Sequence, residues 1–187
     1  GNTPATWFEE TMCELSSHIF LRRLKNCWSL DSDRRKKAYA NHFLEYSKNE
    51  LKKRRHVRTT DLSNKGSDLN EYLKKQNEDR EVNRYIAYRL LHLASTQKGF
   101  WSFVPYLRDI PYDNGLNEYL SIVKSRADSQ SIQTLNLIAS QLLWYHFQNQ
   151  MESPEFPGHR HAHLCQFQSV VDPDSVYLTS VKFPEVQ

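Results

Sequence analysis

The sequence has few of the residues that build several common kinds of functional site. Its 187 residues include only five glycines, which disfavours a glycine-rich loop whose backbone must come close to a phosphate. Its three cysteines, Cys13, Cys27 and Cys165, are an odd number, and their spacing fits neither a disulfide framework nor a zinc finger. Such cysteine usage is typical of a reducing compartment. We therefore expect an intracellular protein, either cytoplasmic or nuclear.

Long hydrophobic runs and catalytic motifs are also absent from the sequence. No apolar run approaches the roughly 18 residues of a membrane-spanning helix, so no transmembrane segment is expected. Neither the Gly-x-Ser-x-Gly nucleophile elbow nor the His-Glu-x-x-His metal motif occurs. Hydrophobic residues make up 39% and charged residues 25% of the chain, as in an ordinary globular domain. These features favour a non-enzymatic protein but leave an enzyme open.

Positive charge is concentrated in the first third of the sequence. Residues 1–60 contain 13 Lys or Arg and 7 Asp or Glu, a net charge of +6. Residues 61–130 are neutral, with 10 residues of each sign, and residues 131–187 have a net charge of −3. The formal charge of +3 for the whole chain therefore hides a basic segment and an acidic one.

Most of the chain shows the hydrophobic spacing of amphipathic helices. Apolar residues recur at intervals of three and four, which places one face of each helix against a core. The segment 68–99 fits one long helix or two helices joined around Asn77. The other helices are expected at 6–30, 33–56, 116–127 and 129–151.

Beyond residue 152 the hydrophobic period changes from about 3.6 to two, which is typical of strands. Two extended segments, 160–171 and 176–183, flank a predicted turn and form a candidate β-hairpin. We therefore expect a mainly α-helical protein. An irregular bundle of about five or six helices would occupy residues 1–152, and a loop plus the β-hairpin (153–187) would be an appendage packed on the helices or on a partner.

The predicted helix 33–56, with the residues just after it, carries two basic clusters. They are separated by about 17 residues, or roughly 25 Å along a helix. This spacing is compatible with phosphates of a nucleic acid, an acidic protein groove or an anionic membrane, although runs of charge usually face solvent. The residues assigned to nucleic-acid or anionic-partner binding are Arg34, Arg35, Lys36, Lys37, Lys52, Lys53, Arg54, Arg55 and Arg58.

A histidine-rich segment lies in the first predicted strand. On a strand, His159, His161, His163 and Cys165 would share one face, and imidazole and thiolate are ligands that zinc prefers. Neighbouring ligands on a strand are about 6.6 Å apart, so one metal ion can bind two of them but hardly three. Zinc is therefore a possible cofactor, against the alternative of a surface histidine cluster.

Aromatic side chains and two prolines are crowded into residues 100–112, which predicts a buried, irregular connector. By default, we expect these rings to fill the hydrophobic core. If they are exposed instead, they would form a patch that binds a partner. Cys13 and Cys27 are likewise expected in the core, on the apolar face of the first helix. The aromatics assigned to partner binding are Phe100, Trp101, Phe103 and Tyr106.

Three functions are compatible with these patterns. The first is a non-enzymatic helical interaction module that binds a macromolecular partner, preferably a protein. The second is a nucleic-acid-binding domain that uses the basic helix 33–58. The third is a metal-dependent hydrolase centred on the histidine-rich strand 159–165.

Overall fold

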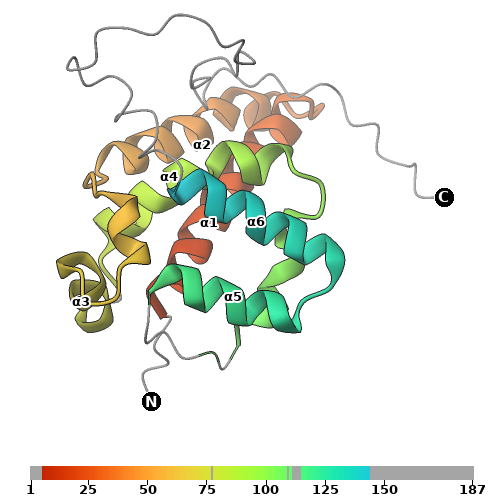
Figure 1. Ribbon diagram of the computed structural model, residues 1–187. Helices are drawn as coiled ribbons and strands as arrows, with labels where there is room; N and C mark the ends of the chain where they lie inside the picture. Colours follow the sequence, from red (N-terminus) through yellow and green to blue (C-terminus); the bar gives the residue numbers. More distant parts are fainter. Residues whose placement is uncertain (1–5, 77, 109, 111–114, 144–187) are drawn as a thin grey trace, which may run out of the picture. The chain divides into compact units, whose positions relative to one another are not determined.

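The protein is helical throughout most of the part that the structure describes. The computed structural model describes residues 6–76, 78–108, 110 and 115–143 (Figure 1). The prediction of a mainly α-helical protein is confirmed. The α-helices are α1 (Thr6–Ser29), α2 (Arg34–Lys52), α3 (Asp68–Lys75), α4 (Arg80–Thr96), α5 (Leu116–Arg126) and α6 (Ser129–Leu143); the 3₁₀ helices are η1 (Thr59–Ser63) and η2 (Phe100–Leu107).

Some predictions fall outside these residues. The β-hairpin at 160–183 lies outside the described residues, as does the final part of the helix predicted for 129–151. The division into domains 1–152 and 153–187 therefore stays a prediction.

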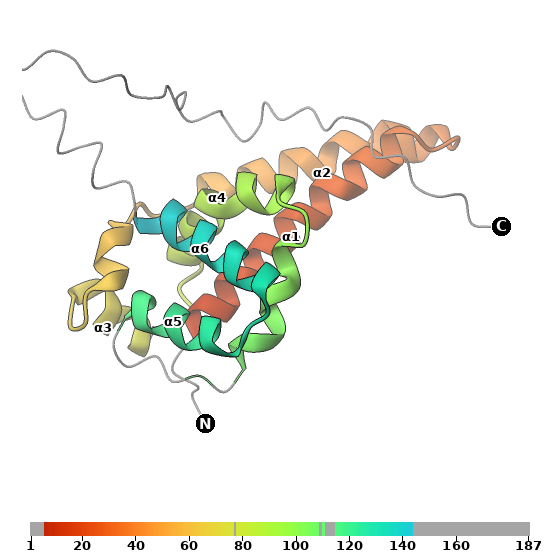
Figure 2. The same ribbon diagram turned by 45° about the vertical axis from the view of Figure 1, so that its right-hand side comes forward.

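Helices α1 and α2 form a long antiparallel hairpin. The turn between them is closed by local hydrogen bonds: the Asp31 carboxylate accepts from the Asp33 amide at 2.9 Å, and the Asp33 carboxylate accepts from the Arg35 amide at 2.8 Å. Asp33 is thus the N-cap of α2, the role that short polar side chains fill best. Figure 2 shows that this turn lies beyond the ends of the other helices.

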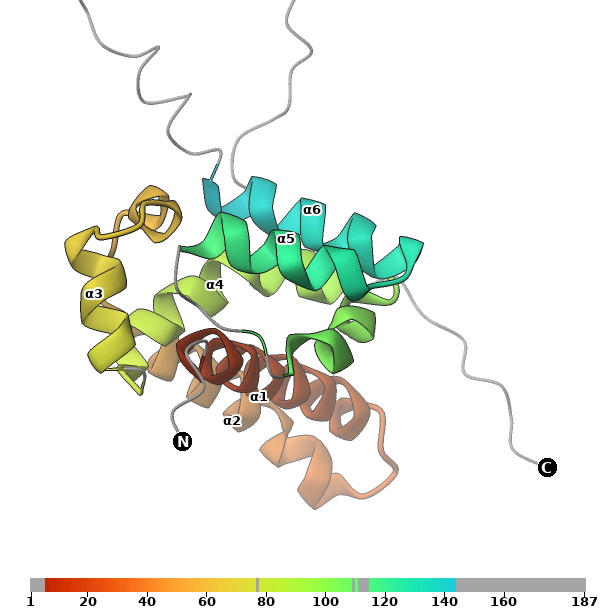
Figure 3. The ribbon, with the colours of Figure 1, turned by 60° about the horizontal axis from the view of Figure 1, so that its bottom comes forward.

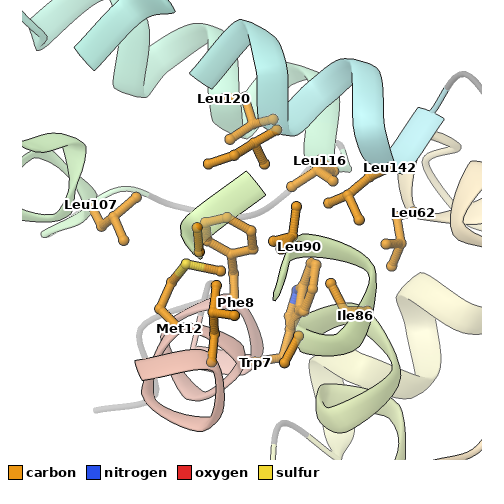
Figure 4. Packing of buried hydrophobic residues seen from close by; sticks show 14 of the residues in the cluster. Trp7, Phe8, Met12, Leu62, Ile86, Leu90, Leu107, Leu116, Leu120 and Leu142 are labelled. Carbon is orange, nitrogen blue, oxygen red and sulfur yellow. The ribbon is translucent and has the colours of Figure 1, made fainter. Parts of the chain in front are cut away.

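The hydrophobic core forms where the first half of α1 meets α4, α5 and α6. Side chains from these helices converge on one cluster, to which η1 and η2 also contribute (Figure 4). Helix α4 is central, because it contacts α1, α2, α6 and η2. Helices α5 and α6 pack side by side (Figure 3). The labelled members of the cluster are Trp7, Phe8, Met12, Leu62, Ile86, Leu90, Leu107, Leu116, Leu120 and Leu142.

The segment 68–99 forms two helices, as one of the two sequence interpretations predicts. Each has its own N-cap: the Ser67 hydroxyl accepts from the Asn70 amide, and the Asp79 carboxylate accepts from the amides of Glu81 and Val82. Because Asp79 satisfies the first amides of α4, the chain starts a new helix here instead of continuing α3.

The segment expected to be an irregular connector is a 3₁₀ helix, η2. Its buried residues Phe100 and Phe103 are three positions apart, which matches the three-residue turn of a 3₁₀ helix. Gly99 precedes η2 with a φ of 74°, in the left-handed region that glycine adopts easily. The aromatic spacing therefore follows the local helix rather than an irregular loop.

The first helix buries a narrower face than its sequence indicates. Cys13 and Cys27 are exposed, so the prediction that both lie in the core is wrong. Phe20 is also 61% exposed. The buried face of the first half of α1 includes Met12 and Leu15, and residues on the opposite side of the helix face away from α4.

Candidate functional site

Aromatic rings cluster at the end of the α1–α2 hairpin, which we define as residues 24–43 and call the hairpin end. Trp28 of α1 packs edge-on against Phe43 of α2, with 4.9 Å between the ring centroids. Tyr39 lies 6.1 Å from Trp28 and 5.4 Å from Phe43. The His42 ring is 4.9 Å from Tyr39. Together these four rings hold the two helices at the hairpin end.

This aromatic cluster is separate from the hydrophobic core. Among the described residues, neither Trp28 nor Phe43 belongs to the core cluster or packs against it. Tyr39 is 52% exposed and Leu30, in the turn, is 87% exposed. Exposed apolar side chains that are grouped, rather than scattered, are typical of a binding surface.

Four basic residues form the first turn of α2, which precedes Tyr39 in the same helix. Arg34, Arg35 and Lys37 are exposed, and within the described part of the chain their side chains make no hydrogen bond or ion pair. Lys36 pairs with Asp31 at 2.8 Å, and this contact lowers the pKa of the Asp31 carboxyl. Cations are unfavourable at a helix N-terminus, where the helix dipole is positive. The interaction of these three cations with the helix dipole is therefore unfavourable.

The second basic cluster does not continue the helix. Helix α2 ends at Lys52, and the prediction of a helix to residue 56 is wrong. The Arg55 amide donates to the carbonyl of Glu81 at 3.0 Å, so contact with the start of α4 replaces a further turn of α2. The two clusters are therefore not arranged as one straight row of cations along a helix 33–58.

Most side chains of the second cluster are paired within the protein. The Arg54 guanidinium donates to the Leu51 carbonyl at 2.8 Å and lies 4.0 Å from the centre of the Tyr88 ring. Arg55 pairs with Asp79 at 2.6 Å. In addition, Lys53 pairs with Glu50, whereas Lys52 and Arg58 are exposed. These residues mainly connect α2 to α4 and leave little charge for a partner.

A buried polar network, which the sequence analysis missed, joins α1, α2 and α4. The Ser47 hydroxyl is 3.0 Å from Nδ1 of His18, and Nε2 of His18 is 3.4 Å from the Glu14 carboxylate. Arg84 donates to Glu14 at 3.0 Å and to Glu50 at 2.7 Å. The only local signal is the four-residue spacing of Glu14 and His18, because the other members come from distant parts of the chain.

This network has the residue types of a hydrolase triad but not the accessibility of one. Ser47 is 0% exposed and His18 is 3% exposed, so a substrate cannot reach the hydroxyl. The His18 imidazole lowers the pKa of the Glu14 carboxyl, with help from Arg84, and together they outweigh the opposing effect of burial. The network is therefore a structural connection between the hairpin and α4.

An open groove lies between α1 and η2. It has a volume of about 460 Å³ and is lined by Ser16, Ser17, Ile19, Phe20, Arg23 and Trp101. The Ser16 and Ser17 hydroxyls donate to the Cys13 carbonyl of their own helix, at 2.8 and 3.0 Å. These small side chains lie close to the large Phe20 and Trp101 rings, which leaves the surface hollow there.

The four aromatics assigned to partner binding have different environments. Phe100 and Phe103 are fully buried in the core and cannot form an exposed patch, so that assignment is corrected for these two. Trp101 and Tyr106 are half-buried and pack against the core, and the Tyr106 hydroxyl donates to Asp128 at 3.2 Å. Only Trp101 and Tyr106 keep area for a partner.

The proposed metal ligands cannot be placed. His159, His161, His163 and Cys165 lie outside the described residues, so the zinc site and the hydrolase remain predictions. Within the residues that the structure does describe, no group of three or more His, Cys, Asp or Glu side chains could hold a metal ion. Nor does that part of the chain contain a helix long and apolar enough to cross a membrane.

Comparison of the chain with known proteins gives no relative: no family model, no curated protein and no solved structure matches it. Inferences about function therefore depend on the surfaces described above.

Proposed function

We propose that this protein is a non-enzymatic interaction module that binds a protein partner through the hairpin end. The observation that carries the proposal is the aromatic cluster outside the core. Trp28, Tyr39 and Phe43 pack mainly on one another, and Tyr39 keeps half of its surface exposed. Large aromatic side chains at such a position are the usual anchors of protein interfaces.

The cations beside the rings support an acidic partner. Arg34, Arg35 and Lys37 have no partner of their own within the described residues, so carboxylates of a bound protein would complement them. A nucleic acid is less well supported, because contacts within the protein occupy Lys53, Arg54 and Arg55. The exposed Leu30 also favours a protein surface, since aliphatic groups gain little from phosphates.

A selection from a displayed library of random peptides tests this proposal. The protein is compared with the triple variant Arg34→Glu, Arg35→Glu, Lys37→Glu. The matched control changes three other exposed cations, Lys65, Lys75 and Arg80, to Glu, so that the net charge changes equally. Single-stranded and duplex oligonucleotides are measured in parallel over a range of salt concentrations.

We expect the unchanged protein and the control to enrich acidic peptides, and the hairpin-end variant to lose at least about tenfold in affinity for them. Equal loss in the hairpin-end variant and the control would mean that only net charge matters, and the proposal would fail. Salt-dependent binding of oligonucleotides without enrichment of peptides would replace the protein partner with a nucleic acid.

A further inference from the structure

The groove between α1 and η2 lies next to the hairpin end on helix α1. Its lining residues on α1 extend from Ser16 to Arg23, and the hairpin end begins at residue 24. The groove has an aromatic wall on each element, Phe20 from α1 and Trp101 from η2. A partner that lies on the hairpin end and continues along α1 would therefore meet this groove.

The groove combines an apolar lining with one positive charge. Phe20 is largely exposed, and Trp101 is half-buried with its ring 5.0 Å from Phe100, which fixes it against the core. Arg23 is exposed, and its side chain makes no hydrogen bond or ion pair with another described residue. A volume of about 460 Å³ is within the usual range of ligand sites, roughly 300–1,000 Å³, so one or two large side chains fit.

We propose that this groove binds an apolar side chain of an acidic segment of the partner protein, while a neighbouring carboxylate of that segment pairs with Arg23. The proposal rests on the proposed function, and it names the chemistry of the partner. The apolar lining selects a bulky aliphatic or aromatic group, and Arg23 selects the charge next to it.

Charge argues against a second copy of this chain as the occupant. The chain has a formal charge of +3, and the hairpin end beside the groove carries Arg34, Arg35 and Lys37, whose side chains are unpaired among the described residues. A symmetric contact of this face with itself would bring like charges together, which is unfavourable. An acidic segment of another protein avoids this repulsion.

Two substitutions in the groove test the proposal, each with a matched control. Phe20→Glu removes the apolar wall and is compared with Leu137→Glu, which changes another exposed apolar residue, on α6. Arg23→Glu reverses the charge and is compared with Lys75→Glu on α3. The probe is a peptide selected by the unchanged protein that contains Asp or Glu beside Trp, Phe or Leu, and its affinity is measured by fluorescence anisotropy.

A spectroscopic measurement locates the bound peptide. The chain has four tryptophans, so 5-fluorotryptophan labelling gives four ¹⁹F resonances, and Trp101→Phe assigns the one in the groove. We expect the Trp101 resonance to shift when peptide is added and that of the buried Trp7 to stay in place. We also expect Phe20→Glu and Arg23→Glu each to weaken binding by about tenfold, and both controls to remain within about twofold.

Three outcomes would overturn the groove proposal. If the hairpin-end variant loses binding but both groove variants keep it and Trp101 does not shift, the proposed function stands and the groove proposal fails. If no acidic peptide containing an apolar residue is selected, the groove proposal fails together with the acidic partner. If light scattering shows a dimer that Phe20→Glu dissociates, the occupant is a second copy of the chain.

Discussion

At the base of the α1–α2 hairpin, which comprises residues 7–19 and 47–58, aromatic and most basic side chains are buried or paired. At the hairpin end, Tyr39 is half exposed, and the side chains of Arg34, Arg35 and Lys37 are exposed and unpaired among the described residues. Phe8 lies in the core at the base, whereas Tyr39 at the end is half exposed. Arg55 has an ion pair, whereas Arg35 has none within the described residues. The same two helices thus serve stability at one end and leave a surface for a partner at the other.

The comparison shows that charge and aromatic content do not by themselves identify a binding surface. The residues at 52–55 are as basic as those at 34–37, yet most of them are occupied by contacts with α2 and α4. The two regions differ in whether a neighbouring helix supplies partners for their basic side chains. Helix α4 packs beside the hairpin base, and the hairpin end lies beyond it (Figure 2).

The largest expected effect contrasts two phenylalanines of the hairpin. Phe8→Ala should lower the free energy of unfolding by about 3–5 kcal/mol, because it leaves a cavity between Trp7 and Tyr119. Phe43→Ala at the hairpin end should cost only about 1 kcal/mol, since the ring is half-buried outside the core. Chemical denaturation measures both. Equal losses would show that the hairpin end is part of the same cooperative core.

The second contrast concerns ion pairs. Arg84→Met should lower the free energy of unfolding by about 2 kcal/mol, because Glu14 and Glu50 lose their shared donor in a largely buried site. Lys36→Met, which breaks the solvent-exposed pair with Asp31, should leave the stability unchanged within error. If Arg84→Met had no effect, the polar network would not connect the hairpin to α4.

The third effect depends on pH and again belongs to the hairpin base. The pKa of Glu14 is lowered in the folded protein, so its ionisation stabilises the fold at neutral pH, and this contribution disappears as the pH falls below the ordinary value of about 4.5. Glu14→Gln should therefore be less stable than the unchanged protein at pH 7, and the difference should shrink as the pH falls below about 4.5 and through the lowered pKa of the folded protein.

Asp79, whose lowered pKa does not depend on Glu14, titrates in both proteins and cancels from this difference. Glu50 does not cancel, because the Glu14 charge raises the pKa of Glu50 and Glu14→Gln removes that effect. Glu45→Gln is the control, because Glu45 is exposed near the hairpin end and, among the described residues, its carboxylate pairs only with the exposed His42. Thermal unfolding between pH 3 and pH 7 gives the comparison. A difference for Glu14→Gln that stays constant over this range would contradict the role of its charge.

The smallest expected effect has the opposite sign. Replacing Arg34, Arg35 and Lys37 with Glu puts negative charge in the first turn of α2, which the helix dipole favours. The free energy of unfolding should rise by about 0.5 kcal/mol while partner binding is lost. Urea denaturation of the variant provides the measurement. A large loss of stability would mean that these cations support the fold and are not reserved for a partner.

The helices themselves could be predicted from local sequence patterns. Helix α1 begins and ends within one residue of its expected bounds, and α5 does the same, because amphipathic spacing and polar breaks are local properties. The face of α1 that is buried was predicted less well. The sequence predicts Cys13 and Cys27 on the apolar face, but packing against α4 covers only the opposite side.

The functional surfaces depend on contacts between distant residues, which one sequence does not reveal. Arg55 is occupied because its guanidinium donates to Asp79, which is 24 positions away in the sequence. The buried His18 likewise contacts Ser47, which is 29 positions away. The basic residues at 34–37 were identified from composition alone. Whether each of their side chains has a partner depends on the folded structure: Lys36 pairs with Asp31, whereas Arg34, Arg35 and Lys37 are unpaired among the described residues.

The two exposed cysteines of α1 allow its outer surface to be labelled with thiol reagents. Cys13 and Cys27 are exposed on one continuous helix, 14 residues or about 21 Å apart, so in a Cys165→Ser variant a pair of spin or fluorescent labels would mark a defined separation along α1. Partial burial, with Glu10 and Glu9 nearby, raises the pKa of the Cys13 thiol, so maleimide should react slowly there at neutral pH. Labels at these positions flank the groove and would report a bound segment without altering any core residue.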